Sequence, residues 1–531
     1  MGRSGDPVGG LFVDISREAG ILKEGYGLGL TIADINQDGW PDVYCANDFL
    51  SNDVVYVNNG GAAGQRTGFT DRAAEYFKHT SYNSMGVDIQ DVNNDTRPDV
   101  MVVDMLPETN ARQKMMLIKT NWEFFCLARQ QGYQDEHVRN TLQLNMSGNR
   151  FSDVGQMAGV FRTDWSWAPL LADLDNDGWK DLFITNGYRR DITNLDYVAY
   201  LNSSASSFGR SNGSGPGSSG DFGRKSLVEL YKLPDVKLHN YVYRNKSADA
   251  QPGDSAGRLG AHIPLFEDKS EEWGFGKPTF SNGAAYADLD NDGDLDLVIN
   301  NMDDEAGLYR NETNRPGKPV ERHSLRLQLP ADARGLGAEV RMRTPDGMTQ
   351  TVAAHPVRGY ASSVEPFVHV GLGKHTDAIV EVRWADGTYQ AVGKLMADRV
   401  YEIPYNPTAV SPPIPAPTPM LFTTADAATI GVTFRHREAP LNDFERTPLL
   451  PQVYAKNSPA IAIADADGNG LDDVFVGGDA GQARSLFLQT SPGRFEERVQ
   501  GANDLEDMGS LFFDADGDGD PDLYVVSGGS R

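Results

Sequence analysis

A phenylalanine that opens a short β-like phrase recurs along this chain at a set distance before an acidic loop. The first four of these residues stand 22 positions before the first Asp of a loop, and the fifth stands 19 positions before one: Phe12, Phe69, Phe151, Phe266 and Phe495. A constant internal offset with variable spacing between units indicates one supersecondary unit used repeatedly, with length changes confined to connections. The chain is therefore an array of repeats.

Six acidic loops share one pattern, with Asp or Asn at positions 1, 3, 5 and 9. These positions are Asp34, Asn36, Asp38 and Asp42 in loop 1; Asp91, Asn93, Asp95 and Asp99 in loop 2; Asp173, Asp175, Asp177 and Asp181 in loop 3; Asp288, Asp290, Asp292 and Asp296 in loop 4; Asp465, Asp467, Asn469 and Asp473 in loop 5; Asp514, Asp516, Asp518 and Asp522 in loop 6. Oxygen ligands at this spacing, turned by a Gly at position 6, suit Ca²⁺, which takes about six to eight oxygens. The sequence predicts about six Ca²⁺ sites.

The loops differ from an EF-hand, which needs a bidentate Glu at position 12. Position 12 lies here in an apolar run, so we expect the Asp at position 9 to close the loop. A buried strand should follow, and we expect this strand to be the innermost one of its unit. Position 7 would supply only a backbone carbonyl, from Trp40, Arg97, Trp179, Asp294, Leu471 and Asp520.

The alternative is that Asp, Asn and Gly merely form turns. Six recurrences of the same four positions favour metal binding over that interpretation. Loop 2 has Thr96 in place of Gly at position 6, so it fits the Ca²⁺ pattern less well.

Much of the chain's acidity belongs to these loops. The formal charge is −27, and the four oxygen positions hold 21 Asp side chains, so six Ca²⁺ ions would bring the charge to −15. A net-negative surface disfavours nucleic acid, and we predict no specific RNA binding. Weak calcium sites fill outside cells, which favours an extracellular, cell-surface or periplasmic location.

Targeting segments and cysteine content do not narrow the predicted location further. No apolar stretch is long enough to span a membrane, and the start of the chain lacks the apolar core of a signal peptide. We therefore expect a fragment of a longer protein whose export signal lies elsewhere. Two cysteines, Cys45 and Cys126, imply no disulfide framework.

Four short strands per unit predict an all-β fold of β-propeller blades, each a four-stranded sheet with a calcium loop. The expected organisation is blades over 1–318, with a helical insertion at 107–140 and a flexible insertion at 202–223; a small β domain over 319–405; a Pro-rich linker over 406–424; and further, incomplete repeats over 425–531. The insertion at 107–140 either packs on the blades or forms a ligand lid.

The repeats resemble FG-GAP/VCBS repeats, the blades of integrin-α-like propellers. The segment with "GLGAEVRM", "RGYASSVEP", "HVGLG" and "VEVRWADGT" resembles the ASPIC/UnbV module. Together they are similar to cartilage acidic proteins and to large exported proteins of Bacteroidota. The resemblance implies a two-propeller protein, of which this chain is a part, although one propeller interrupted by the module stays open.

The resemblance also implies calcium-dependent adhesion or scaffolding, with an unknown protein or carbohydrate ligand at a cell surface and no catalysis. The chain has no His-x-x-x-His, Gly-x-Ser-x-Gly or Cys-x-x-Cys motif, and most clustered carboxylates have a predicted metal role. A polysaccharide lyase or glycosidase on a calcium propeller is the alternative.

A polar residue also recurs 13 positions after the start of each of the first four loops, as Asn47, Asp104, Asn186 and Asn301. We expect a turn cap there. The alternative is a polar ring at the end of a central channel.

Overall fold

The computed structural model describes residues 13–49, 51–60, 68–116, 122–146, 150–200, 231–249, 263–315, 321–407, 409–410, 424–438, 441–450, 454, 459–502 and 504–528. The chain forms two compact units, Met1–Ala416 and Pro417–Arg531, which we call the N-terminal and C-terminal units. The predicted flexible insertion 202–223 and most of the predicted linker 406–424 lie outside the described residues.

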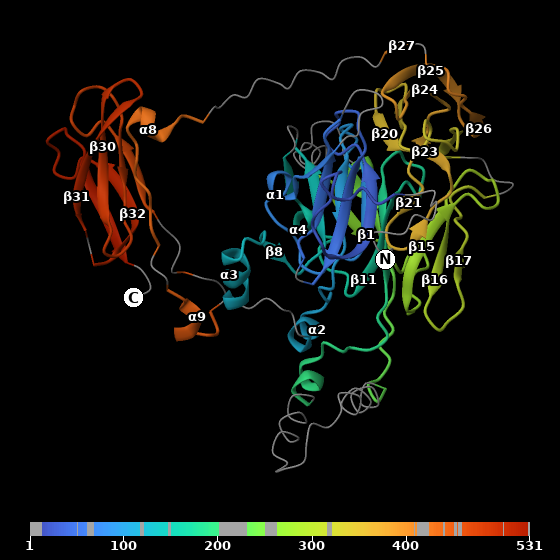
Figure 1. Ribbon diagram of the computed structural model, residues 1–531, viewed down its shortest axis with the longest axis horizontal. Coiled ribbons are helices and arrows are strands. Elements are labelled where there is room, and N and C mark those ends of the chain that lie inside the picture. Colours follow the sequence, from blue (N-terminus) through green and yellow to red (C-terminus); the bar gives the residue numbers. More distant parts are fainter. Residues whose placement is uncertain are drawn as a thin grey trace. The chain divides into compact units, whose positions relative to one another are not determined.

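Four antiparallel sheets follow one another in the N-terminal unit (Figure 1). Each begins with the strand that enters an acidic loop, followed by the strand that leaves it. The strands are β1 (Tyr26–Ala33), β2 (Asp42–Asp48), β3 (Val54–Asn58) and β4 (Phe69–Asp71) in sheet 1; β6 (Val87–Gln90), β7 (Asp99–Val102), β9 (Thr141–Asn145) and β10 (Phe151–Asp153) in sheet 2; β11 (Ser166–Ala172), β12 (Asp181–Asn186), β13 (Tyr241–Asn245) and β14 (Phe266–Asp268) in sheet 3; β15 (Ser281–Ala287), β16 (Asp296–Asn301) and β17 (Gly307–Tyr309) in sheet 4. The prediction of a mostly β fold with four-stranded sheets is confirmed.

The Phe strands complete the sheet of the preceding loop. Phe69 pairs with Asn58, and Phe266 pairs with Asn245, each at the end of the third strand. The unit expected from the sequence, which runs from Phe to the next loop, is therefore offset by one strand from the folded sheet.

The strand that leaves each loop is second in its sheet, so the expectation that it lies innermost is wrong. Adjacent sheets instead meet through their first strands, the ones that enter the loops. These strands approach so closely that a Cβ at Gly86 would lie 2.0 Å from the Trp167 carbonyl oxygen. Glycine permits this approach because it has no side chain.

The segment predicted as a helical insertion contains two helices, α2 (Asn110–Met115) and α3 (Trp122–Gln130). Phe124 lies edge-on to Tyr82, and Phe125 stacks on His137 with ring centroids 6.2 Å apart. These contacts favour packing on the repeats over a lid. Shorter elements nearby are α1 (Ala73–Tyr76), β5 (Thr80–Ser81), β8 (Glu136–His137), α4 (Gly155–Ala158) and the 3-10 helix η1 (Lys246–Asp249).

The segment that follows sheet 4 forms two further sheets and a hairpin, which we call the module. Its strands are β18 (His323–Gln328), β19 (Glu339–Arg343), β20 (Thr349–Ala353), β21 (Val357–Arg358), β22 (Ser362–Ser363), β23 (Phe367–Gly373), β24 (Asp377–Arg383), β25 (Thr388–Met396), β26 (Arg399–Glu402) and β27 (Ala409–Val410). An apolar core that includes Trp384, Val380 and Leu325 joins the two sheets.

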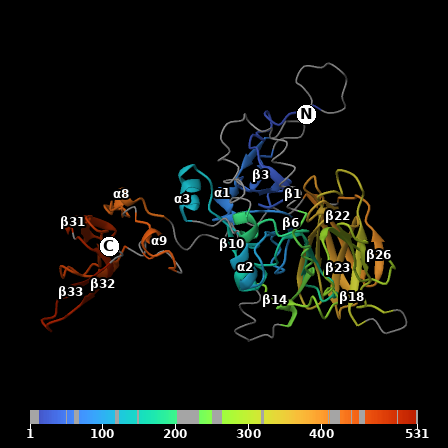
Figure 2. The same ribbon diagram turned by 90° about the horizontal axis from the view of Figure 1, so that it is seen from below.

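The module's β21–β22 hairpin reaches the first strands of the repeat sheets, and Figure 2 shows the module beside them. Val87 and Gly359 exchange backbone hydrogen bonds of 3.3 and 3.1 Å. The buried Arg358 guanidinium lies 3.4 Å from the buried Asp88 carboxylate, which also accepts the Leu171 N–H at 2.7 Å. The module therefore packs into the array at its first strands.

The C-terminal unit contains one four-stranded and one two-stranded sheet. Its elements are α8 (Ala427–Ile430), α9 (Asp443–Arg446), β28 (Ile461–Ala464), β29 (Asp473–Val476), β30 (Ala483–Ser491), β31 (Arg494–Ala502), β32 (Glu506–Phe513) and β33 (Asp522–Gly528). Loop 5 joins β28 to β29, and loop 6 joins β32 to β33.

Candidate metal centres

The Asp at position 9 anchors every acidic loop to its sheet. In loop 3, Asp181 Oδ2 accepts the Leu174 N–H at 3.1 Å, and Asp181 Oδ1 accepts the N–H of Asn245, at the end of the third strand, at 2.9 Å. The first contact recurs in all six loops and the second in loops 1 to 5. Position 9 thus ties loops 1 to 5 to the third strand, and in loops 3, 5 and 6 its carboxylate also belongs to a convergent group.

Positions 1 and 6 fix the turn. A carboxylate oxygen at position 1 accepts the N–H of position 6 at 2.8 to 3.2 Å in all six loops. Position 6 has φ between +73° and +97°, a conformation that favours Gly, and Thr96 adopts it with φ of +73°. Loop 2 therefore has the same backbone as the others despite its β-branched residue.

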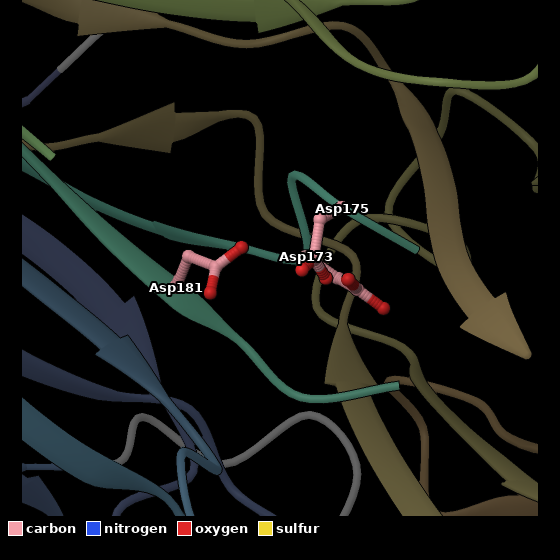
Figure 3. A group of neighbouring side chains, drawn as sticks. All are labelled: Asp173, Asp175 and Asp181. Atoms are coloured by element: carbon pink, nitrogen blue, oxygen red, sulfur yellow. The ribbon is translucent and has the colours of Figure 1, made fainter. Parts of the chain in front are cut away.

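In four loops three carboxylates converge. Carboxylate oxygens of Asp173, Asp175 and Asp181 lie within 4.8 Å of one another, and Figure 3 shows the first two on loop 3 and the third at the start of β12. The equivalent groups are Asp288, Asp290 and Asp292 in loop 4; Asp465, Asp467 and Asp473 in loop 5; Asp514, Asp516 and Asp522 in loop 6. All-oxygen donor sets of this kind are compatible with Ca²⁺.

The electrostatics of loop 3 also suit a cation. Burial, with the Asp177 and Asp175 carboxylates as further causes, raises the pKa of Asp173 well above its usual value. Ionised carboxylates this close repel one another unless a positive charge lies between them. Arg244 and Arg322 supply part of that positive charge at Asp175, and the convergent carboxylates of loop 3 are compatible with a divalent cation as well.

Loops 1 and 2 have Asn at position 3, and their carboxylates are not among the convergent groups found in the described residues. In loop 1, Asp34 Oδ1 is buried without a hydrogen-bond partner, which leaves it available to a cation. In loop 2, Arg97 pairs with Asp95, and the buried Lys180 ammonium donates to the Asp91 carbonyl oxygen at 2.8 Å. Loop 2 thus already has two resident cations and fits Ca²⁺ least well.

Arginine side chains contact a predicted ligand in each of loops 1 to 4, and three of them belong to the module. Arg383 lies 3.1 Å from Asp34, Arg322 lies 2.6 Å from Asp175, and Arg326 lies 2.9 Å from Asp288. Arg244 of β13 also contacts Asp175 and Asp177. Sequence reasoning missed these arginines because no local pattern assigns them to a loop.

Side chains at position 4 join neighbouring loops. The amide nitrogens of Gln37, Asn94 and Asn176 donate to the position 6 carbonyl oxygen of the next loop, on Thr96, Gly178 and Gly293, at 2.6, 2.9 and 2.9 Å. At the end of the series, the position 4 side chain of loop 4, Asn291, accepts from Arg326 at 3.3 Å. An amide at position 4 of the first four loops is a sequence signal that could have predicted these links.

The polar residue 13 positions after the start of each of the first four loops bonds to backbone groups. Asp104 accepts the N–H groups of Tyr82 and Asn83, and Asn186 donates to the Thr163 carbonyl oxygen at 2.9 Å. Asn47 donates to Asn52, and Asn301 donates to Glu305. The bonds of Asn47 and Asn301 span 5 and 4 positions, as expected of a turn cap. Those of Asp104 and Asn186 reach segments 21 to 23 positions earlier, so the cap prediction fits only the first pair.

Two family models match the chain. The FG-GAP-like repeat model matches residues 34–102 and 465–525, and the ASPIC and UnbV model matches residues 330–410. The chain is therefore a protein of FG-GAP-like repeats with an ASPIC and UnbV domain, which confirms the resemblance inferred from the sequence.

The chain has distant similarity to cartilage acidic protein 1. It is 24% identical to the Homo sapiens protein over 383 residues, which cover 70% of this chain and 43% of that protein. It is 22% identical to the Mus musculus protein over 427 residues, which cover 69% of this chain and 62% of that protein. The chain thus spans about half the length of these relatives.

Solved structures match only weakly. A lectin of Agrocybe aegerita, described as recognising non-reducing terminal N-acetylglucosamine, aligns with a TM-score of 0.23 at 12% identity over 89% of this chain and 80% of the lectin. The V. cholerae biofilm matrix protein Bap1 aligns with a TM-score of 0.21 at 11% identity over 93% and 73%. TM-scores this low support no argument about fold or ligand.

Proposed function

We propose that this protein is a calcium-stabilised extracellular β-propeller protein that binds a protein or carbohydrate ligand, as an adhesion or scaffold component, and catalyses no reaction. The observation that carries the proposal is the recurrence of one loop geometry six times, with convergent carboxylates in four loops. Repeated sheets that meet through their first strands support the assignment of propeller blades.

The residues proposed to hold Ca²⁺ are those at positions 1, 3, 5 and 9, with the position 7 carbonyl. When bound, the ion would neutralise clustered carboxylates and hold each loop in shape. The chain's own contribution is to fix those oxygens: position 9 from the sheet, and position 1 from the N–H of position 6. Metal bound only by the folded state stabilises that state.

A groove beside loop 3 is the candidate ligand surface of this proposal. Its volume is about 720 Å³, and aromatic and basic side chains line it: Trp273, Phe275, Tyr309, Arg244, Lys269, Arg310, Arg315 and Arg322. The rings of Phe275 and Tyr309 stack with centroids 4.5 Å apart. The groove has five basic side chains against three acidic ones, Asp175, Glu272 and Glu312, and on a chain of charge −27 this excess favours an anionic ligand.

The groove also contains carboxylates, which bears on the alternative of a polysaccharide lyase or glycosidase. Glu272 pairs with Lys269 at 2.7 Å, and Glu312 pairs with Arg310 and Arg315. Carboxylates held in ion pairs favour binding over acid–base catalysis, which needs a group able to take and release a proton. Shortening of a polyuronate chain by the protein would establish the enzyme instead.

The test of ligand binding compares variants of the full chain in Ca²⁺ against sulfated and uronate oligosaccharides and an acidic peptide. Trp273→Ala and Arg315→Ala should each weaken binding by about tenfold or more, because a stacked or charged anchor contributes over 1 kcal/mol. Lys394→Ala, an exposed change on the module, is the matched control. Equal affinity in all variants would remove the groove from the proposal.

No described helix has the length and apolar character that crossing a membrane requires. An extracellular or periplasmic location therefore rests, within this proposal, on the calcium loops. Cell-surface fractionation of the full-length protein would test it directly.

A further inference from the structure

A separate acidic cluster lies in the C-terminal unit, outside the six loops. Carboxylate oxygens of Glu438, Asp479 and Glu506 lie within 4.8 Å of one another. Asp479 follows β29, and Glu506 opens β32, whereas loops 5 and 6 join the opposite ends of these strands. The cluster is therefore at the end of the sheets away from the predicted calcium loops.

Two of the three cluster residues are buried, and Glu438 is partly exposed. Asp479 and Glu506 are 6% and 4% exposed. Within the described residues, Glu506 Oε1 and Glu438 Oε2 are buried oxygens without a hydrogen-bond partner. Arg484 pairs with Asp507, the residue after Glu506, at 3.3 Å. Buried carboxylate oxygens normally have a partner or a bound cation, so these two oxygens are available to a cation.

Surrounding groups hold the cluster in place. The Gln482 side chain accepts the Arg437 N–H at 2.9 Å and donates to the Arg435 carbonyl oxygen at 2.8 Å, and the Gln482 N–H donates to the Asp479 carbonyl oxygen. These bonds fix the segment before Glu438 against the turn after Asp479. His436 Nε2 lies 3.0 Å from Glu438 Oε1, which orients that carboxylate in the way that outer groups orient metal ligands.

We propose that Glu438, Asp479 and Glu506 bind one divalent cation of the oxygen-preferring kind, such as Ca²⁺ or Mn²⁺. Three carboxylates from three segments supply hard oxygen ligands, and water completes the coordination of such ions. The site ties the segment before β28 to the sheet and to β32. It is independent of the six loops and of the function proposed above.

Native mass spectrometry of the full chain, with Mn²⁺ and separately with Ca²⁺, tests the site by counting bound ions. Glu506→Gln keeps the side-chain volume and should lose one ion per chain. Asp516→Asn in loop 6 should lose a different ion, so the double variant should lose two. Glu496→Gln, an exposed change in the same unit, should keep the wild-type count.

Glu438→Gln provides a second route, because the Glu438 side chain is 27% exposed and its substitution disturbs packing less. It should lose the same ion as Glu506→Gln, so combining the two should lose only one. If folded Glu438→Gln retains the wild-type count in both metals, the site does not exist.

Discussion

The acidic loops of the two units share one backbone conformation but differ in their surroundings. In the N-terminal unit, an amide at position 4 of loops 1 to 3 bonds to the next loop, and arginines contact loops 1 to 4. Loops 5 and 6 have Gly468 and Gly517 at position 4, and no arginine pairs with their carboxylates among the described residues of the C-terminal unit.

The difference extends to burial. The carboxylates of loop 6 are exposed, and the strands beside it expose Leu511, Phe513 and Tyr524 by 58, 44 and 59%. Loop 3 lies between neighbouring sheets and the module, with Asp173 and Asp181 buried. The first set of loops is therefore held partly by protein contacts, whereas under the proposed function the second set depends more on bound Ca²⁺.

Chelation should separate the two units most clearly. Two ions at about 100 times their dissociation constants stabilise a fold by roughly 5 kcal/mol. Amide and arginine contacts hold loops 1 to 4 without metal, and loops 5 and 6 lack these contacts among the described residues, so EGTA should lower the melting transition of the C-terminal unit by the larger amount. Differential scanning calorimetry with and without excess Ca²⁺ measures both transitions. Equal shifts in the two would contradict the comparison, and no shift in either would remove calcium as a structural element.

The buried pair of Arg358 and Asp88 should matter almost as much, and only in the N-terminal unit. Arg358→Met leaves the Asp88 carboxylate buried without its cation, at a cost of about 3–5 kcal/mol. The N-terminal transition should fall while the C-terminal one stays. Arg343→Met, an exposed change on the module, is the control and should leave both melting transitions unchanged. If Arg358→Met also leaves the N-terminal transition unchanged, the hairpin contact adds little stability.

Increasing pH should weaken the N-terminal unit at a point away from its loops. Burial raises the pKa of the Glu136 carboxyl to about 8, so the folded state binds this proton more tightly than the unfolded state does. The resulting stabilisation is fully present at pH values below the ordinary pKa of Glu, and it is lost as pH rises through about 8. With Ca²⁺ fixed, the N-terminal Tm should fall by roughly 3 °C or more between pH 5 and 8.5. Glu136→Gln should flatten the decline, and an unchanged slope would assign it elsewhere.

Removing one link between loops should have a smaller effect. Asn94→Gly copies the C-terminal loops at position 4 and removes the hydrogen bond to the Gly178 carbonyl oxygen, at a cost of about 1 kcal/mol. Glycine's tolerance of the φ of +56° at this position offsets part of that cost. The reciprocal Gly468→Asn should change the C-terminal transition by less. Urea unfolding measures both, and similar effects would mean that the links do not distinguish the units.

Loop 2 should gain slightly from a glycine. Thr96 has φ of +73°, which is unfavourable for a β-branched residue, so Thr96→Gly should stabilise the N-terminal unit by roughly 0.5–1 kcal/mol. The gain should appear with and without Ca²⁺. A loss of stability would indicate that the threonine side chain makes a compensating contact.

The sequence predicted the features that depend on local chemistry. Six loops with positive φ near position 6, and the strands that flank them, follow from the spacing of Asp, Asn and Gly. The innermost strand was mispredicted because an unbroken apolar run, such as Leu182–Ile184, indicates only that a strand is buried. The second strand of a sheet is also buried, because it lies between two neighbouring strands. Periodicity alone does not say which edge faces the next sheet.

Apart from the amides at position 4, the contacts between repeats were beyond local patterns. Asn145 at the end of β9 donates to the Ile35 carbonyl oxygen of loop 1, and Arg383 reaches Asp34 from a segment 349 positions later. Such pairs exist only once the sheets are packed. The cluster at Glu506 was missed for the same reason, since its three residues share no motif.

The position of Arg326 bears on how this protein can be divided. Its guanidinium holds both Asp288 of loop 4 and Glu365 of the module, all largely buried, and Ser324 beside it donates to the Gly293 carbonyl oxygen. The module thus acts on the last repeat as a terminal cap acts on a solenoid, satisfying groups that the next repeat would otherwise cover. A shortened chain that stops after sheet 4 would leave a buried acid without its counter-charge and the first strands without their hairpin. Expression fragments should therefore keep the repeats and the module together.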